Sequence, residues 1–319
     1  MKRYPLCLSV GLLTAMLASR STFGAEPDSR TLAKNVPEKL PPTVRFNVGG
    51  DSERKIGELT WHTDYASAYE AARQAKKMLF IFFRDESRPH IADSYERDVL
   101  SHTQLRERLN GVVRVVLPTD VATPGKPLET DAARLLDHAA FAFMYKRQGI
   151  AMLDLTDKHS THFGQVVSAH PFSQGRYYTV HGTELVIGLP RGTITQRTLV
   201  WAVREHAAGP LSTTGQCHDA LLQQANRHSQ LQAQFESVGH HDWGTRYNEI
   251  AVATGRSASE VAASSWGAQS LVEAAQQIVQ NWAGSGAHWG MVATPQALYG
   301  YDMVRAASGN WYGTGIFAN

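Results

Sequence analysis

The spacing of apolar residues along the first two thirds of the chain predicts helices that alternate with strands. Residues 61–77 carry alanines at helical spacing, and the unbroken apolar run 78–83 that follows is typical of a buried strand. Similar patterns continue as far as residue 207. They predict helices within 91–109, 129–145 and 196–207, and strands near 112–118, 150–155 and 163–169. This order is a βαβαββα series around one sheet, with 176–193 as an extra hairpin or long loop.

The last third of the chain predicts a smaller layered domain. Helical patterns cover 218–238 and 270–282, a short Gly/Ser turn follows, and strands are expected at 288–293 and 310–318. Alternate residues of the final strand face opposite sides of a sheet: Trp311, Gly313, Gly315 and Phe317 on one side, Tyr312, Thr314 and Ile316 on the other. Helices combined with a small antiparallel sheet indicate an α+β fold.

Shifts in composition mark the start of the chain and a boundary between these two parts. Residues 1–25 have the basic, apolar and small-residue order of a secretory signal peptide, so we expect an exported, periplasmic or extracellular protein. The apolar run is too short to favour a permanent transmembrane helix, and no transmembrane segment is expected after cleavage. Residues 26–56 predict a flexible lead-in and 208–215 a linker, which leaves 57–207 and 216–319 as the expected domains.

The charge balance argues against nucleic acid as a partner. The 319 residues include 31 Lys and Arg against 29 Asp and Glu, so the sequence predicts neither a basic surface nor an acidic tail. Of the two cysteines, Cys7 lies in the expected signal peptide and Cys217 would remain in the mature protein. A disulfide within one mature chain is therefore excluded, and we expect Cys217 to be a small, buried apolar residue.

Residues 57–207 resemble a thioredoxin-like domain. The resemblance is carried by residues 63–83, where an alanine-rich helix that ends in lysine is followed by the central strand. Such domains carry a C-x-x-C motif just after this strand, where this chain has Ser87 and His90. Thiol–disulfide exchange needs a thiolate, and a hydroxyl and an imidazole cannot replace the two cysteines. The domain is therefore expected to be a redox-inactive α/β scaffold.

Residues 216–319 resemble the short, disulfide-free bacterial form of the CAP domain, the superfamily of SCP and pathogenesis-related cysteine-rich secretory domains. The match rests on "HHDWGTR" at 240–246, on Glu260 at the position of the family's "GEN" glutamate, and on the W-x-x-S-x-x-H motif at 282–288. A Gly-rich aromatic strand closes the domain, as it does in the family. The resemblance implies an α+β fold of the αβα sandwich type.

The same resemblance implies a cleft that can hold a divalent cation. Carried over by position, the cleft residues are His240, Glu260 and His288, whereas the family's second glutamate has no secure match. Ser259 and Val261 replace the glycine and asparagine of the "GEN" motif, so the cleft is degenerate. Two neutral imidazoles and one carboxylate could bind zinc and leave one coordination position open.

Each of these three residues also has a simpler interpretation. His288 could pack in its turn against a tryptophan, His240 could be a solvated loop histidine, and Glu260 could brace a helix. The compact metal motif H-E-x-x-H and the nucleophile motif G-x-S-x-G are both absent. Both interpretations of the trio remain open at this point.

Three functions follow from these patterns. We expect an exported two-domain protein that acts as a non-catalytic binding or envelope-associated module, with a protein, glycan or lipid as its partner. The alternative is a metal-dependent, protease-like hydrolase in which His240 and His288 bind a metal such as zinc and Glu260 is a ligand or a base. A further alternative is lipid or sterol binding in a hydrophobic groove of residues 216–319. Thiol–disulfide oxidoreductase activity is excluded because the cysteines it needs are absent.

Overall fold

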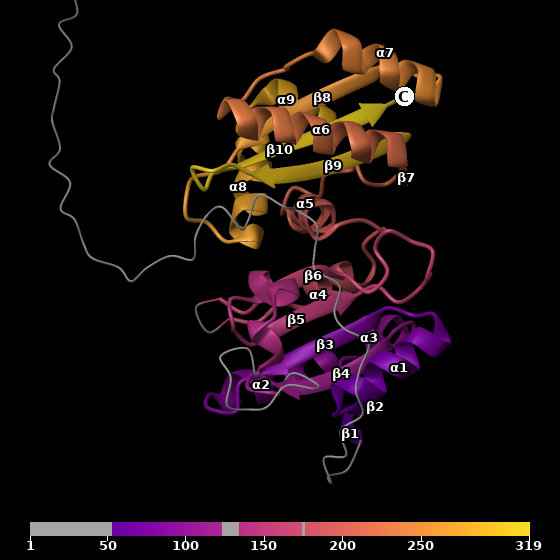
Figure 1. The fold of residues 1–319 in the computed structure, drawn as a ribbon, viewed down its shortest axis with the longest axis vertical. Coiled ribbons are helices and arrows are strands. Elements are labelled where there is room, and N and C mark those ends of the chain that lie inside the picture. Colours follow the sequence, from indigo (N-terminus) through magenta and orange to yellow (C-terminus); the bar gives the residue numbers. More distant parts are fainter. Residues whose placement is uncertain (1–52, 123–133, 174–175) are drawn as a thin grey trace, which may run out of the picture. The chain divides into compact units, whose positions relative to one another are not determined.

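The described part of the chain contains two mixed sheets. The strands of the first sheet all lie before residue 172. The computed structural model describes residues 53–122, 134–173 and 176–319. In sheet order, the strands are β1 (Glu53–Ile56), β2 (Leu59–His62), β4 (Val113–Pro118), β3 (Leu79–Arg84), β5 (Gly149–Leu153) and β6 (Val166–Pro171). Strands β2, β4 and β3 run parallel to one another, whereas β5 and β6 are antiparallel to their neighbours (Figure 1).

The helices around this sheet begin at defined caps. α1 (Tyr65–Ala75) begins after Asp64, whose carboxylate accepts a hydrogen bond from the Ser67 amide at 2.7 Å. α5 (Ile194–Glu205) begins at a capping box that starts at Thr193. The other helical segments here are α2 (Pro89–Tyr95), a π-helical turn (Glu96–Leu100), α3 (Thr103–Asn110), two 3-10 turns (Leu135–Asp137 and Ala139–Met144) and α4 (Val180–Ile187).

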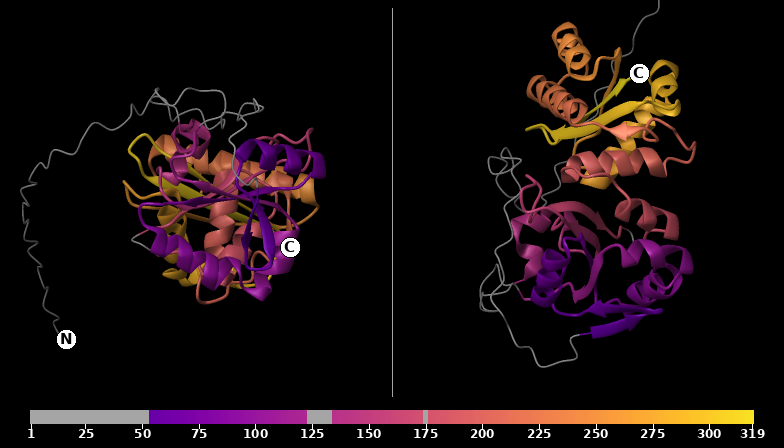
Figure 2. Two further views of the ribbon diagram at one scale, coloured as in Figure 1. Left: turned by 90° about the horizontal axis from the view of Figure 1, so that it is seen from below. Right: turned by 90° about the vertical axis from the view of Figure 1, so that its right-hand side faces the viewer.

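The second sheet carries helices on both faces (Figures 1 and 2). α6 (Asp219–Phe235) and α7 (Trp243–Thr254) pack on one face, and α8 (Leu271–Ala283) packs on the other face together with α5. α9 (Gly286–Ala293) follows α8. In sheet order, the strands are β7 (Gln216–Cys217), β9 (Leu298–Arg305), β10 (Trp311–Ala318) and β8 (Ala258–Ser264). The β7–β9 pair is parallel and the other two pairs are antiparallel.

Alternation along β10 decides which side chains meet which helices. Thr314 faces α6, where its hydroxyl lies 3.0 Å from Nδ1 of His228, and Ile316 packs in the apolar cluster on the same side. Gly313 faces α8 so closely that a Cβ at this position would lie 2.9 Å from Ile278. The alternation predicted for the last strand is therefore confirmed, and helices cover both faces of the strand.

Helix α5 contacts both sheets. Near its start, the buried Arg197 donates a hydrogen bond to the Ser168 hydroxyl of β6 at 2.9 Å. At its other end, Arg204 donates to the hydroxyl of Tyr299 on β9 at 3.2 Å. The apolar core is accordingly continuous from the first sheet, through α5, to the α8 side of the second sheet.

The segment 208–215, expected as a linker, is hydrogen-bonded to its surroundings. The amides of Leu211 and Ser212 donate to the carbonyls of Ala293 and Val292, each at 3.1 Å. The Ser212 side chain is buried, and its hydroxyl also hydrogen-bonds to a tyrosine of β9. This segment is therefore held against the end of α9.

Three expectations about local structure are wrong. Residues 288–293 lie in helix α9, residues 176–193 contain helix α4, and residues 53–56 of the expected lead-in form strand β1. A short apolar run does not distinguish a strand from a helix by its periodicity, which explains the error at α9. At α4, the Thr179 hydroxyl caps the helix by accepting a hydrogen bond from the Gly182 amide at 3.0 Å.

Other expectations fall partly or wholly outside the described residues. Within the helix expected at 129–145, the described residues form two 3-10 turns from residue 135 onward. The expected signal peptide, 1–25, and the lead-in as far as residue 52 lie outside the described residues. Across the described ranges, we find no helix with the length and apolar character needed to cross a bilayer.

Candidate functional site

Glu260 is a buried carboxylate in strand β8. Its Cα pairs with that of Ile316 on β10, and the residue is 5% exposed. Its neighbour Val261 belongs to the core on the α8 side of the sheet. Because successive side chains of a strand point to opposite faces, Glu260 faces α6 and α7. A carboxylate in this position needs partners that replace water.

The main partner is Arg246 of α7, which is fully buried. Its two terminal nitrogens form a bidentate pair with the two oxygens of Glu260, with Nη2 at 3.0 Å from Oε1. The other guanidinium hydrogen bonds go to the carbonyl of His241, at 3.0 and 3.1 Å. The ring centroid of Trp243 lies 5.2 Å from the same guanidinium. Arg246 therefore supplies both the opposite charge and a rigid geometry for Glu260.

Two histidines complete the surroundings of Glu260. Nδ1 of His240 lies 2.9 Å from Oε1, and Nδ1 of His228 lies 3.2 Å from Oε2. His228 is fully buried on α6, and its burial, reinforced by the charge of Arg246, lowers its pKa to about 3. The His228 imidazole is therefore neutral at physiological pH, so it lies close to Glu260 without adding charge, and its Nδ1 forms a hydrogen bond with the Thr314 hydroxyl.

Both oxygens of Glu260 are engaged by these partners. A carboxylate offers about four lone-pair sites. Oε1 contacts His240 and Arg246, and Oε2 contacts Arg246 and His228. Glu260 is thus occupied as an orienting group, and it offers no free oxygen to a metal ion or to a substrate proton.

His240 is the part of the cluster that reaches solvent. Its side chain is 53% exposed, and its Nε2 has no hydrogen-bond partner among the described residues. When Nδ1–H donates to Glu260, the neutral ring presents Nε2 as an acceptor. The arrangement can therefore hold an oriented imidazole against a bound polar group.

Of the expected trio, the structure brings together His240 and Glu260 but leaves His288 apart from their network. His288 lies half-buried on α9, and its side chain has no hydrogen bond, ion pair or ring contact with another described residue. Within the described residues, no group of three His, Cys, Asp or Glu side chains could hold a metal ion. The expected zinc-binding arrangement is therefore not assembled in this part of the chain, because Arg246 occupies the carboxylate.

Sequence reasoning missed His228. It lies on the buried stripe of α6 together with Leu221 and Ala225, at helical spacing. A histidine on such a stripe, followed by the buried polar residues Ser229 and Gln232, marks a polar network inside the core. This pattern on α6 is visible in the sequence. It does not indicate that His228 lies next to Glu260, because Glu260 lies far along the chain.

The position that corresponds to the thioredoxin motif carries no thiol. Ser87 follows β3 and donates its hydroxyl to the Asp85 carboxylate at 2.6 Å, and His90 is exposed in α2. Cys217, the free cysteine of the described residues, was expected to be buried; it is half-buried and packs against the apolar core. Burial raises the pKa of its thiol to about 11, which keeps the sulfur protonated.

Comparisons with known proteins provide no relative: no family model matches the chain, and neither the curated proteins nor the solved structures include a match. The described residues form a mixed α/β protein with two mixed sheets. Its candidate site is the Glu260 cluster, which we define as Glu260, Arg246, His228 and His240.

Proposed function

We propose that the chain is an exported, periplasmic or extracellular binding protein in which His240 contacts the ligand. The proposal combines a thioredoxin-like scaffold without thiols with a CAP-like region. Export is inferred from the order of basic, apolar and small residues in 1–25. Fold alone does not define a function, so the role of the protein is argued from the Glu260 cluster.

The first sheet supports the thioredoxin-like part of the proposal. Its strands β2-β4-β3-β5-β6 combine three parallel neighbours with two antiparallel strands at one edge. Helix α1 connects β2 to β3, as expected from the alanine-rich stretch before the central strand. Because Ser87 and His90 stand after that strand, this part would serve as a scaffold.

The second sheet supports the CAP-like part. Its antiparallel strands β8, β10 and β9 lie between α6 and α7 on one face and α8 on the other, which agrees with a layered sandwich. The W-x-x-S-x-x-H motif spans the end of α8 and the start of α9: Trp282 is buried, Ser285 precedes α9 and His288 lies within it.

The observation that carries the binding role is the difference between the surroundings of Glu260 and those of His240 within the Glu260 cluster. Both oxygens of Glu260 accept hydrogen bonds from protein partners, whereas His240 is held at Nδ1, its side chain is 53% exposed, and its Nε2 has no hydrogen-bond partner among the described residues. Phe235, which is 57% exposed, packs edge-on against His241, the residue after His240 in the chain, with ring centroids 5.3 Å apart. A polar group next to an exposed aromatic ring suits a glycan, which has hydroxyls and an apolar face.

The proposal is tested by co-sedimentation of residues 26–319 with purified peptidoglycan sacculi, used as the glycan probe. We expect the wild-type protein to sediment with the sacculi, and His240→Ala to lower the bound fraction by about fivefold or more. His90→Ala, which removes an exposed histidine far along the chain, is the matched control and should bind as the wild type does. Equal binding by His240→Ala, or no binding by the wild type, would contradict the proposal.

Two parallel measurements address the alternative functions. Metal analysis that found one equivalent of zinc, lost in His240→Ala, would replace the proposal with a metal-dependent hydrolase. Saturable binding to phosphatidylglycerol vesicles in place of sacculi would replace it with lipid binding. The interior beneath α8 gives lipid less support, because Trp282, Tyr301 and Phe317 fill it with contacting rings.

A further inference from the structure

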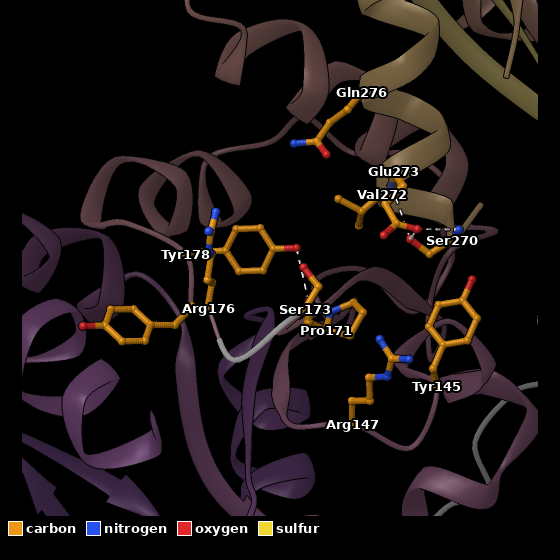
Figure 3. Close-up of a pocket in the computed structure, with 11 residues that line it drawn as sticks. Tyr145, Arg147, Pro171, Ser173, Arg176, Tyr178, Ser270, Val272, Glu273 and Gln276 are labelled. Carbon is orange, nitrogen blue, oxygen red and sulfur yellow. Dashed lines mark hydrogen bonds between the residues drawn. The ribbon is translucent and has the colours of Figure 1, made fainter. Parts of the chain in front are cut away.

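A second polar site lies at the start of α8, outside the Glu260 cluster. It is a pocket of about 150 Å³ (Figure 3). One wall comes from the chain around β5 and β6, and the other comes from the first turns of α8. The lining residues that the argument uses are Tyr145, Arg147, Tyr178, Ser270, Val272 and Glu273.

Arg147 and Glu273 bring opposite charges to this pocket without pairing with each other. The Arg147 side chain is exposed and points toward Ser270 and Glu273 in Figure 3, yet no hydrogen bond or ion pair joins it to any described residue. By contrast, Arg84 and Arg246 each pair with a carboxylate. Opposite charges that line one pocket without contacting each other leave room for a ligand that pairs with both.

Tyr145 links the two segments that carry these charges. Its hydroxyl accepts a hydrogen bond from the Leu271 amide, in the first turn of α8, at 3.3 Å. Burial raises the pKa of this hydroxyl, the negative charge of Glu273 adds to the rise, and the positive charge of Arg147 opposes it. Both charges therefore act on one hydroxyl, which itself holds the turn before Arg147 against the start of α8.

Glu273 is held in place through one of its two oxygens. Its Oε2 accepts hydrogen bonds from the amide and the hydroxyl of Ser270, at 3.0 and 2.8 Å, which completes a capping box at the start of α8. Its Oε1 has no hydrogen-bond partner among the described residues. The carboxylate is thus positioned by the protein and keeps one oxygen for a cationic group.

The rest of the pocket offers apolar and aromatic surface. Pro171 and Val272 are buried residues of its lining. The Tyr178 hydroxyl donates to the carbonyl of Pro171 at 3.4 Å, and its ring packs against Trp201 with centroids 5.5 Å apart. The pocket therefore combines fixed apolar walls with a few charged groups, as small-molecule sites do.

We propose that this pocket binds the zwitterionic head group of a small α-amino acid, with the carboxylate paired to Arg147 and the ammonium to Oε1 of Glu273. A guanidinium can donate two parallel hydrogen bonds to a carboxylate, and an ammonium donates to a carboxylate oxygen. At about 30 Å³ per water molecule, the pocket accommodates a ligand the size of a few waters, which suits a short side chain. The proposal does not depend on the function of the Glu260 cluster.

The test is isothermal titration calorimetry of residues 26–319 with L-alanine, propionate and ethylamine, each at the same ionic strength. We expect saturable binding of L-alanine. Propionate lacks the ammonium and ethylamine lacks the carboxylate, so each should bind at least about fivefold more weakly. Absence of saturable L-alanine binding, or equally tight binding of either fragment, overturns the proposal.

Single substitutions assign the two charges. Arg147→Gln and Glu273→Gln should each weaken L-alanine binding by about tenfold or more. Arg176→Gln is the matched control, because the Arg176 guanidinium lies on the other side of the Tyr178 ring from Arg147 in Figure 3. It should change the affinity by less than about twofold. Unchanged affinity in either of the first two variants, or an equal loss in the control, contradicts the assigned geometry and overturns the proposal.

Propionate binding to Glu273→Gln separates lost charge from lost structure. Glutamine can retain the capping box with Ser270, so the start of α8 should keep its structure. Removing the negative charge should strengthen propionate binding by several-fold relative to the wild type, because like-charge repulsion is removed. Unchanged or weaker propionate binding would mean that Glu273 does not face the ligand, and the proposal would fail.

Discussion

Two buried carboxylates face α6 from the two strands that flank β10, and their charges are stabilised in different ways. Glu260 lies on β8 and is paired with the guanidinium of Arg246. Asp302 lies on β9, opposite Thr314, is fully buried and forms no ion pair with a cationic residue in the described part of the chain. The same sheet thus contains a carboxylate held by an opposite charge and another held by neutral donors.

Asp302 receives four hydrogen bonds. The donors are Thr195 and the Met303 amide to Oδ1, at 2.7 and 2.8 Å, and Gln196 and Asn226 to Oδ2, both at 3.0 Å. Burial nevertheless raises the pKa of Asp302 to about 6, because the four donors only partly replace the lost solvation. Neutral hydrogen bonds can position a buried carboxylate without making its ionisation as favourable as it is in water.

The two sites also differ in what they connect. Asp302 joins α5, through Thr195 and Gln196, to α6 through Asn226, so it lies where helices from two parts of the sequence meet. The Glu260 cluster joins α6, α7 and β8 and reaches solvent at His240. Both carboxylates therefore link structural elements in the interior, but Glu260 also holds a surface side chain.

The largest effect is expected when the charge pair is broken. Arg246→Met leaves Glu260 buried and without a cation, which should cost about 3–5 kcal/mol of unfolding free energy. Urea unfolding near neutral pH measures this loss. Arg227→Met, which removes an exposed arginine paired with Glu249, is the control and should change the free energy by less than about 1 kcal/mol.

A second substitution identifies the cause of that loss. Adding Glu260→Gln to Arg246→Met removes the unpaired charge and should recover part of the lost stability. If the double variant were less stable than Arg246→Met alone, the packing of the arginine would be responsible, and the contrast with Asp302 would no longer rest on charge.

Asp302→Asn is expected to have the next largest effect, and that effect depends on pH. The folded-state pKa of about 6 lies above the ordinary value of 3.8, so the folded protein retains a proton that the unfolded chain has lost. This contribution to stability is present at low pH and is lost as the pH rises from about 4 to about 6. A difference of about two pKa units corresponds to about 3 kcal/mol.

We therefore expect Asp302→Asn to gain stability relative to the wild type as the pH rises from about 4 to about 7. The comparison must be made with the wild type at each pH, because burial lowers the pKa of His170 and of His228 to about 3 and these residues act in the opposite direction. Urea unfolding at several pH values measures the difference. A difference between the two proteins that did not vary with pH would show that Asp302 keeps an ordinary pKa.

The contrast between the two carboxylates also indicates how far sequence reasoning can reach. Local patterns predicted β3 and the two faces of β10, because each depends on residues adjacent in the chain. They failed at α9, where a short apolar stretch fits either type of element. Position in a resembling motif brought His240 and Glu260 together, and the structure places them 2.9 Å apart.

What the sequence could not supply was the set of long-range partners. Arg246 was noticed as part of a motif, but its bidentate contact with Glu260 depends on the packing of α7 against β8. Asp302 was not singled out, because its donors Thr195 and Gln196 lie more than a hundred residues earlier in the chain. Their meeting depends on how α5 contacts the second sheet, which local propensity does not determine.

A smaller effect is expected from removing one neutral donor. Asn226→Ala takes one hydrogen bond from Asp302 and should raise the pKa of its carboxyl further. The cost should be about 1–3 kcal/mol at about pH 8, where Asp302 is ionised, and less at about pH 4. Gln230→Ala is the control, because its side chain bonds Asn226 and not Asp302. Equal losses at both pH values would contradict a role in stabilising the charge.

The smallest effect on stability is expected at His240. His240→Ala removes one contact from Oε1 of Glu260, but Arg246 keeps both of its bonds, and water can reach the vacated position because the histidine was half exposed. Urea unfolding should therefore show a loss below about 1 kcal/mol, even though the same variant is expected to lose binding to sacculi. A loss above about 2 kcal/mol would mean that Glu260 depends on His240 as Asp302 depends on its neutral donors, and the contrast between the two carboxylates would fail.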